Sequence, residues 1–149
     1  MDQLFLKDDN PKKFKGLMPT EKDVIQQLAN GLEYIHSLQL VHGDIRPENV
    51  HLFVPTNGSA PALVKWAGFA LFKQLDKLGG CALTQVKGSL IWMAPELLEL
   101  YLPSIKSSSA TAAVWKRLQR ADVFAAGLTM FYYLTGGFHP LLPLSKNRF

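Results

Sequence analysis

The sequence is poor in cysteine, which limits how the chain can be held together. Cys81 is the only cysteine among 149 residues, so no disulfide can form within the chain and no metal site can rest on thiolates. This scarcity is typical of proteins from a reducing compartment. The first residues, MDQLFLKDDNP, also lack the apolar core of a secretory signal peptide. A cytoplasmic location is therefore expected.

Long apolar runs and concentrated charge are lacking as well. The most apolar stretch, VFAAGLTMFYYL at 123–134, falls short of the roughly 20 residues that cross a bilayer, so it predicts a buried helix. The net charge of +4 is scattered, and the two densest basic clusters have no interleaved aromatic residues. They contain Lys12, Lys13 and Lys15, and Lys116, Arg117 and Arg120. Solvated surfaces are expected there, and no nucleic-acid partner.

Hydrophobic periodicity predicts a helix and a hairpin in the first half of the chain. Apolar residues recur at helical spacing over 21–37, and Thr20 with Asp23 forms an approximate capping box before them. The stretches VHLFV at 50–54 and ALVKW at 62–66 have β-like composition and flank a segment rich in turn formers. An antiparallel hairpin is expected from them.

The second half predicts two further helices. A short one begins in APELLELYL at 94–102, and a final one covers 121–135 and ends at the Gly136–Gly137 pair. Residues 67–93 have no strong period and predict an extended loop, while the small polar stretch 103–115 predicts a surface insertion. The side chains expected in the core are Leu32, Ile35, Leu52, Trp66, Phe69, Trp92, Phe124, Leu128 and Phe131.

The stretch LVHGDIRPENVHLF at 40–53 places polar residues between two apolar runs. Phosphoryl transfer needs a carboxylate near the attacking hydroxyl, oxygen ligands for the metal, and a cation that offsets phosphate charge. Asp44 could supply the carboxylate, the amide oxygen of Asn49 a metal ligand, and Arg46 the cation. A loop with this spacing between two strands can turn all three side chains toward one cleft.

This stretch resembles the catalytic loop of protein kinases, whose family pattern is His-Arg-Asp-Leu-Lys-x-x-x-Asn. Three more resemblances follow in the family's order. WAGFALFKQL (66–75) is similar to the strand and turn around Asp-Phe-Gly, KGSLIWMAPE (87–96) to the end of the activation segment, and ADVFAAGLTMFYYLTGG (121–137) to the central C-lobe helix. The pair Gly88–Ser89 before LIWMAPE resembles the substrate loop of Ser/Thr-type protein kinases. The last segment most resembles the inositol-requiring kinase/endoribonuclease branch of ER-stress sensors.

The resemblance implies a fold and a set of residue roles. The fold would be α+β, mainly α: a partial kinase domain over 1–149, made of C-lobe helices plus a short β-hairpin, with the N-lobe absent. Asp44 would be the catalytic base, and Arg46 would face a phosphate group of the substrate. Asn49 would bind the magnesium ion that accompanies ATP, and would thereby contribute to ATP binding. Ser89 would belong to the substrate loop, near Asp44. The residues with implied structural roles are His42, whose backbone would meet Asp122, together with Phe69 and Glu96.

Departures from the family pattern change the functional expectation. Gly43 replaces the arginine before the catalytic aspartate, and Gly68 stands where the family has its metal-binding aspartate. Loss of such an electrostatic partner costs roughly a thousandfold in rate. No Gly-x-Gly-x-x-Gly or Val-Ala-x-Lys precedes the loop, so half of an ATP cleft is missing. These departures predict impaired catalysis and count against binding of ATP and magnesium by this chain.

Three functions remain open on the sequence. The first is an active Ser/Thr kinase. The second is a pseudokinase that binds a protein partner, such as a full-length kinase paralogue, through Ser89–Glu96 and 103–115. The third is a truncated product without a role of its own. Asp44 could equally be a relic that organises the loop, and Asn49 could cap it through side-chain to backbone bonds without metal. As part of a longer sensor, the chain would lie at the cytosolic face of the ER.

Overall fold

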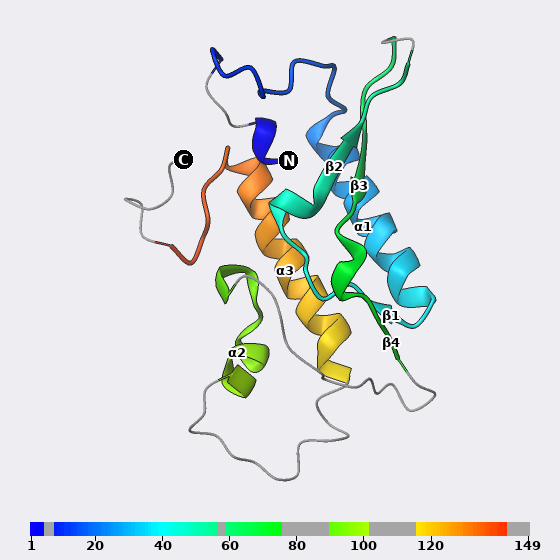
Figure 1. Cartoon of the computed structure of the whole chain (residues 1–149), viewed down its shortest axis with the longest axis vertical. Coiled ribbons are helices and arrows are strands. Elements are labelled where there is room, and N and C mark those ends of the chain that lie inside the picture. Colours follow the sequence, from blue (N-terminus) through cyan, green and yellow to red (C-terminus); the bar gives the residue numbers. More distant parts are fainter. Residues whose placement is uncertain (5–7, 57–58, 76–89, 102–115, 143–149) are drawn as a thin grey trace.

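Three α-helices and two small antiparallel sheets form the structure (Figure 1). The computed structural model describes residues 1–4, 8–56, 59–75, 90–101 and 116–142. In chain order the elements are η1 (Asp2–Leu4), α1 (Glu21–Ser37), β1 (Leu40–Val41), η2 (Pro47–Asn49), β2 (Val50–Phe53), β3 (Leu63–Trp66), η3 (Phe69–Leu71), β4 (Lys73–Gln74), η4 (Leu90–Trp92), α2 (Pro95–Tyr101) and α3 (Lys116–Leu134), the η elements being short 3-10 helices. None of the helices in these ranges combines the length and apolarity that a membrane span requires.

Helix α1 begins and ends where its sequence pattern predicts. The Thr20 hydroxyl accepts a hydrogen bond from the backbone N–H of Asp23 at 3.2 Å and donates to the Asp23 carboxylate at 2.6 Å. This cap satisfies one of the N–H groups that the first helical turn leaves without a partner. The four buried side chains of α1 recur every three or four positions and form one face: Val24, Leu28, Leu32 and Ile35.

The predicted hairpin is confirmed by strands β2 and β3. They pair antiparallel, with Val50 opposite Trp66 and Leu52 opposite Val64. Strand β3 packs against α1, where the Trp66 indole N–H donates to the carbonyl of Leu28 at 2.8 Å. A Cβ added to Gly31 would lie 3.3 Å from the Trp66 ring, so a glycine at this position lets helix and strand approach closely.

A second, two-residue ladder was not expected from the sequence. In it β1 pairs antiparallel with β4, with Leu40 opposite Gln74 and Val41 opposite Lys73. The described parts of 67–93 therefore contain η3, β4 and η4 rather than an extended loop alone. Strands of two residues carry too few side chains to produce a period. The ladder ties the segment after β3 back to the segment before the polar loop.

Helix α3 begins at Lys116, earlier than the predicted start at 121, and ends at Leu134. Gly136 and Gly137 follow with φ of 71° and 98°, and their N–H groups donate to the carbonyls of Tyr133 and Tyr132. This left-handed ending satisfies carbonyls of the last turn and confirms the predicted stop. The short helix α2 is confirmed as well, whereas 103–115 lies outside the described residues.

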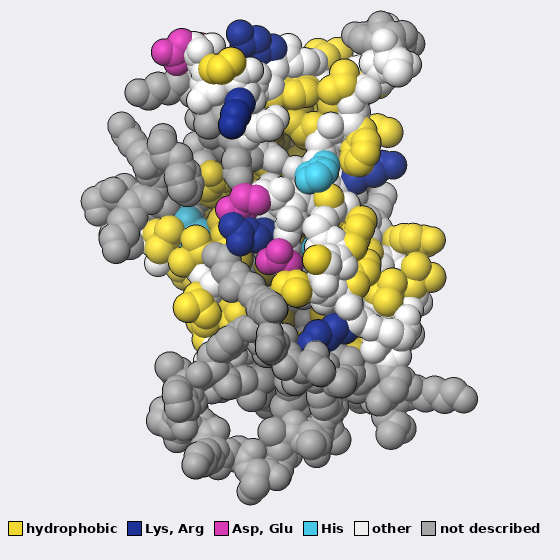
Figure 2. Space-filling model, viewed as in Figure 1, with side chains coloured by type: hydrophobic (Ala, Val, Ile, Leu, Met, Phe, Trp, Pro, Cys, Tyr) yellow, Lys and Arg dark blue, Asp and Glu magenta, His cyan; other side chains and the backbone are white. Residues whose placement is uncertain are grey.

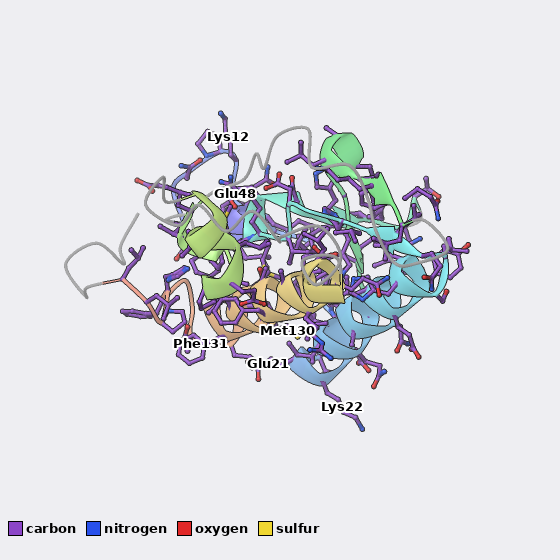
Figure 3. All side chains as sticks on the ribbon, turned by 90° about the horizontal axis from the view of Figure 1, so that it is seen from below. Lys12, Glu21, Lys22, Glu48, Met130 and Phe131 are labelled. Atoms are coloured by element: carbon purple, nitrogen blue, oxygen red, sulfur yellow. The ribbon has the colours of Figure 1, made fainter. Side chains whose placement is uncertain are left out.

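The core lies where α1, the hairpin and α3 meet, and α1 and α3 run side by side (Figure 1). Leu32, Ile35, Trp66, Trp92 and Leu128 are buried as expected, and Leu52 and Phe124 are partly buried against the core clusters. Two expectations are wrong. Phe69 is 55% exposed and Phe131 is 44% exposed. Figure 3 shows Phe131 at the outer side of α3, while Met130 beside it packs against the core.

Candidate functional site

Helix α3 holds the start of the polar loop, at His42 and Gly43, through hydrogen bonds to Asp122. The buried Asp122 carboxylate accepts the backbone N–H of His42 at 2.8 Å through one oxygen and that of Gly43 at 2.9 Å through the other. His36, in the last turn of α1, lies 3.0 Å from the same carboxylate through Nε2. The contact between His42 and Asp122 is the one that the sequence resemblance implies. Sequence reasoning missed His36, because no motif marks it.

His42 is completely buried, and its surroundings are those of a packing residue. Its Nε2 lies 2.9 Å from the carbonyl of Ala67. Its ring centroid is 4.9 Å from that of Phe72, 5.8 Å from Phe69 and 6.2 Å from Trp66. Burial lowers the pKa of His42, and the nearby Asp122 opposes this only in part. The ring is therefore held neutral and connects the loop to the segment after β3.

Asp44 and Asn49 face each other across the loop. The Asn49 side-chain amide donates to the Asp44 backbone carbonyl and to the Asp44 carboxylate, both at 2.7 Å. The backbone N–H of Asp44 also donates to Nδ1 of His42 at 3.3 Å. Both side chains are half-buried. The loop thus satisfies its own polar groups, as the capping interpretation of Asn49 predicts.

Arg46 is engaged with Glu48 two positions later. Its Nε donates to one carboxylate oxygen of Glu48 at 2.7 Å, and its terminal NH2 group pairs with the other oxygen. Burial would raise the pKa of Glu48, but the hydrogen bond from Arg46, a backbone hydrogen bond and the charges of Arg46 and the N-terminus together hold that pKa below its ordinary value. The guanidinium therefore turns its planar fork toward a carboxylate of its own loop.

The two glycines that depart from the kinase pattern both adopt left-handed backbone conformations. Gly43 has φ 75°, and Gly68 has φ 80° and ψ 42°. A Cβ built on Gly43 would lie 3.1 Å from the carbonyl oxygen of Leu71. A Cβ on Gly68 would overlap the carboxamide of Asn49. Both glycines are thus required by backbone conformation and by space.

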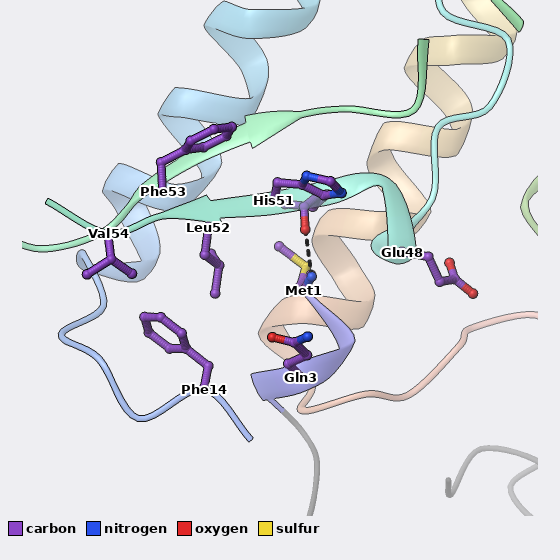
Figure 4. Close-up of a pocket in the computed structure, with 9 residues that line it drawn as sticks. Met1, Gln3, Phe14, Glu48, His51, Leu52, Phe53 and Val54 are labelled. Carbon is purple, nitrogen blue, oxygen red and sulfur yellow. Dashed lines mark hydrogen bonds between the residues drawn. The ribbon is translucent and has the colours of Figure 1, made fainter. Parts of the chain in front are cut away.

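A cavity of about 410 Å³ lies beside the loop, between β2 and the N-terminal segment (Figure 4). There Leu52 points from β2 toward Phe14, and the Met1 amino group donates to the carbonyl of Val50 at 2.7 Å. The lining residues are Met1, Gln3, Phe14, Glu48, Val50, His51, Leu52, Phe53 and Val54. Glu48 is the loop residue among them, and neither Asp44 nor Asn49 opens into the cavity.

Comparison with known proteins decides the family. Residues 10–147 match the protein kinase domain family. This chain belongs to the protein kinase family. The kinase chain is 37% identical over 135 residues to the human serine/threonine-protein kinase/endoribonuclease IRE2. The aligned region covers 89% of this chain and 13% of IRE2. The three helices and small antiparallel sheets are compatible with a partial kinase domain.

Other relatives of the kinase chain point to the same family. The serine/threonine-protein kinase/endoribonuclease IRE1 of Hypocrea jecorina is 34% identical over 78% of this chain and 11% of its own length. The mouse serine/threonine-protein kinase SBK1 is 34% identical over 80% of this chain and 24% of its own length. The chain therefore spans less than a quarter of each relative's length.

The magnesium that kinases use does not fit the residues found here. Gly68 offers no side-chain oxygen, so position 68 supplies no ligand for a cation. Within the described ranges, no three His, Cys, Asp or Glu side chains come together as a metal site would need. Hard cations such as magnesium take oxygen ligands, most often carboxylates. The loop keeps Asp44 and Asn49, whereas position 68 supplies no carboxylate.

Two further kinase positions were predicted from the sequence. Ser89 lies outside the described residues, so its predicted place near Asp44 stays a prediction. Glu96 lies in the first turn of α2 and is half-buried, and its implied structural role stays a prediction.

Proposed function

We propose that this chain is a C-lobe segment of a Ser/Thr-type protein kinase whose own phosphoryl transfer from ATP is impaired or lost. The observation that carries this proposal is that Gly68 stands where the family has its metal-binding aspartate. A transferring phosphate needs a cation to offset its charge. Among the described residues, no three His, Cys, Asp or Glu side chains gather to hold one, which supports the loss of activity.

A transfer assay tests this proposal directly. The purified chain is incubated with γ-labelled ATP, magnesium and a general Ser/Thr substrate, beside the Asp44→Asn variant. We expect no transfer above background and no difference between the two proteins. Transfer that disappears in Asp44→Asn would establish an active kinase and overturn the proposal.

Nucleotide binding is measured separately, because an inactive kinase can keep ATP. We expect that magnesium adds nothing to any affinity for ATP, since Gly68 replaces its carboxylate ligand. Isothermal titration with ATP in the presence of magnesium, and again with EDTA, measures this. A tenfold or larger gain in affinity with magnesium would contradict the expected loss of the metal site.

We further propose that the chain acts by binding a protein, namely a longer kinase of the same branch. Its likeness to kinase/endoribonucleases from human and from fungi favours this partner and supports a role in the unfolded-protein response. The chain and this longer kinase would bind one another in the cytoplasm or at the cytosolic face of the ER. Co-sedimentation of the chain with a full-length kinase/endoribonuclease tests the proposal. Sedimentation as two independent species would refute it.

A further inference from the structure

Strand β2 has one edge that no other strand covers. Its partner β3 lies along the opposite edge, and the described part of this sheet has two strands. The Ala67 N–H donates to the Asn49 carbonyl at 2.8 Å, one position before the pair of Val50 and Trp66. Hydrogen-bonded and non-hydrogen-bonded pairs alternate along an antiparallel ladder, so Val50 and Leu52 are non-hydrogen-bonded positions. Their N–H and C=O groups therefore point away from β3, toward the uncovered edge.

The outer edge of β3 follows the same alternation but is already capped. The Val64 N–H donates to the side-chain oxygen of Gln27 at 2.8 Å. The Ala62 N–H donates to the carbonyl of Leu17, also at 2.8 Å. An edge whose N–H groups are occupied is a poor template for a further strand. The hairpin can therefore be extended at β2 rather than at β3.

On the β2 edge, the groups of Val50 are occupied and those of Leu52 are open. The Val50 N–H donates to the carbonyl of Pro47, and the Val50 carbonyl accepts from the Met1 amino group at 2.7 Å. Among the described residues, no segment outside the hairpin hydrogen-bonds to the N–H or C=O of Leu52. Leu52 lines the cavity of about 410 Å³ beside β2. An open donor and acceptor on an edge strand are a template for an added strand.

Apolar side chains surround this open edge. Leu52 points toward Phe14 across the cavity (Figure 4). Phe53 and Val54 follow along the chain and are 51% and 54% exposed. An apolar side chain brought to this edge would lose contact with water and gain contact with Phe14 and Val54. Backbone hydrogen bonds and apolar contacts are thus offered side by side.

Lysines accompany the two aromatic residues of the cavity. Lys12 and Lys15 are exposed and lie within two positions of Phe14. The amino group of Lys65 lies 5.6 Å from the centroid of the Phe53 ring. A bound segment would therefore meet positive charge beside its apolar contacts.

The neighbouring carboxylates do not cancel this positive charge. Asp8 pairs with Lys13, and Glu48 pairs with Arg46. Asp9 adds one further negative charge, which the three lysines outweigh. Complementary charge across an interface selects the partner, so a segment with Asp or Glu beside its apolar residues is favoured here.

We propose that the open edge of β2, from Leu52 to Val54, binds an extended segment of a partner protein in which acidic residues flank a short apolar stretch. The segment adds to the hairpin as a third strand through the backbone groups of Leu52 and places an apolar side chain against Phe14. The surface includes neither Asp44 nor Asn49. The proposal therefore goes beyond the proposed function and does not depend on the loss of phosphoryl transfer.

Fluorescence anisotropy of a labelled peptide with the full chain tests the proposal. The probe is fluorescein-Glu-Val-Ile-Val-Glu-amide, and its control carries N-methyl groups on the central Val-Ile-Val. We expect saturable binding of the probe and about tenfold weaker binding of the control, because methylation removes the N–H groups that pair with Leu52. Equal affinity of the two peptides, or no saturable binding of the probe up to about 1 mM, would overturn the proposal.

Two variants of the chain locate the binding surface. Phe14→Ala should weaken binding of the probe about fivefold through lost apolar contact, whereas Phe131→Ala, which alters an exposed phenylalanine of α3, should leave it unchanged. Lys65→Glu should weaken it about threefold at low salt, whereas Lys22→Glu on α1 should not (Figure 3). Lys65 is exposed, so its variant keeps the test decisive if Phe14→Ala does not fold. Equal effects of each variant and its control would place the peptide elsewhere and overturn the proposal.

Sedimentation velocity separates a partner protein from a second copy of the chain. We expect the chain alone to sediment as a monomer. A dimer that the probe dissociates would mean that the β2 edge pairs with a second copy, which would overturn the assigned occupant. Phosphate transfer by a chain that binds the probe would refute only the proposed loss of catalysis.

Discussion

Two glycines at the loop each remove a charged side chain of the family pattern and each adopt a backbone conformation that favours glycine. Gly43 and Gly68 stand where the kinase pattern has an arginine and an aspartate, so each removes a charged side chain. Each also adopts a positive φ that other residues avoid. Gly43 further donates its N–H to Asp122 and approaches the Leu71 carbonyl. The surrounding structure has adapted to the glycines, so restoring the family residue is not expected to restore the family site.

Gly43→Arg tests this at the N-terminal end of the loop. We expect the free energy of unfolding to fall by about 1–3 kcal/mol, because arginine must adopt φ 75° with its Cβ against the Leu71 carbonyl. Urea unfolding followed by circular dichroism measures the loss. Gly127→Arg is the control: its site is an exposed helical position with open space, and arginine is the better helix former. Equal stability of the two variants would contradict the prediction.

At the level of elements, α3 is apolar on more than one face. Leu128 packs with Trp92 and Tyr132 in a buried cluster, while Val123, Phe131 and Leu134 are exposed. Figure 2 shows several separate groups of hydrophobic side chains on one face of the molecule, with charged side chains between them. A helix with apolar residues all round belongs to a larger core or meets a partner. Its sequence therefore predicts burial of the helix without saying which side faces inward.

A pair of alanine variants in α3 separates its two faces. Leu128→Ala should lower the free energy of unfolding by about 2–4 kcal/mol, since it leaves a void against Trp92 and Tyr132. Phe131→Ala removes a larger side chain but one that is 44% exposed, so we expect a loss below about 1 kcal/mol. Urea unfolding of both variants gives the comparison. A larger loss for Phe131 would mean that its face is covered in solution.

The elements predicted correctly are those with a strong local signal. Helix α1 has a cap and a regular apolar stripe, and the hairpin has two β-like runs around turn formers. The ladder of β1 and β4 depends on residues more than thirty positions apart, which no local pattern reveals. The candidate site follows the same rule. The loop residues were found by their motif, whereas His36 and the fit between Asn49 and Gly68 exist only in three dimensions.

At the scale of the whole molecule, two buried histidines join separate parts of the core. His42 connects the loop to Phe72 and Trp66. The ring of His139, just after α3, makes an edge contact with Trp92 at a centroid distance of 4.4 Å. Both side chains are almost completely buried. Burial lowers the pKa of each histidine below the ordinary value of 6.5. Neither ring is therefore expected to gain a proton until the pH is below that value.

The chain should consequently lose stability in mild acid. A histidine with a lowered folded-state pKa binds fewer protons folded than unfolded, so its unfolding free energy declines as pH falls below 6.5 and levels off below the folded-state pKa. Urea unfolding between about pH 7.5 and pH 5.5 should show this decline. His139→Gln should make the decline shallower, whereas Leu128→Ala, which removes no proton-binding group, should lower stability by the same amount at every pH. A constant or rising unfolding free energy toward pH 5.5 would mean that these rings accept protons inside the folded core.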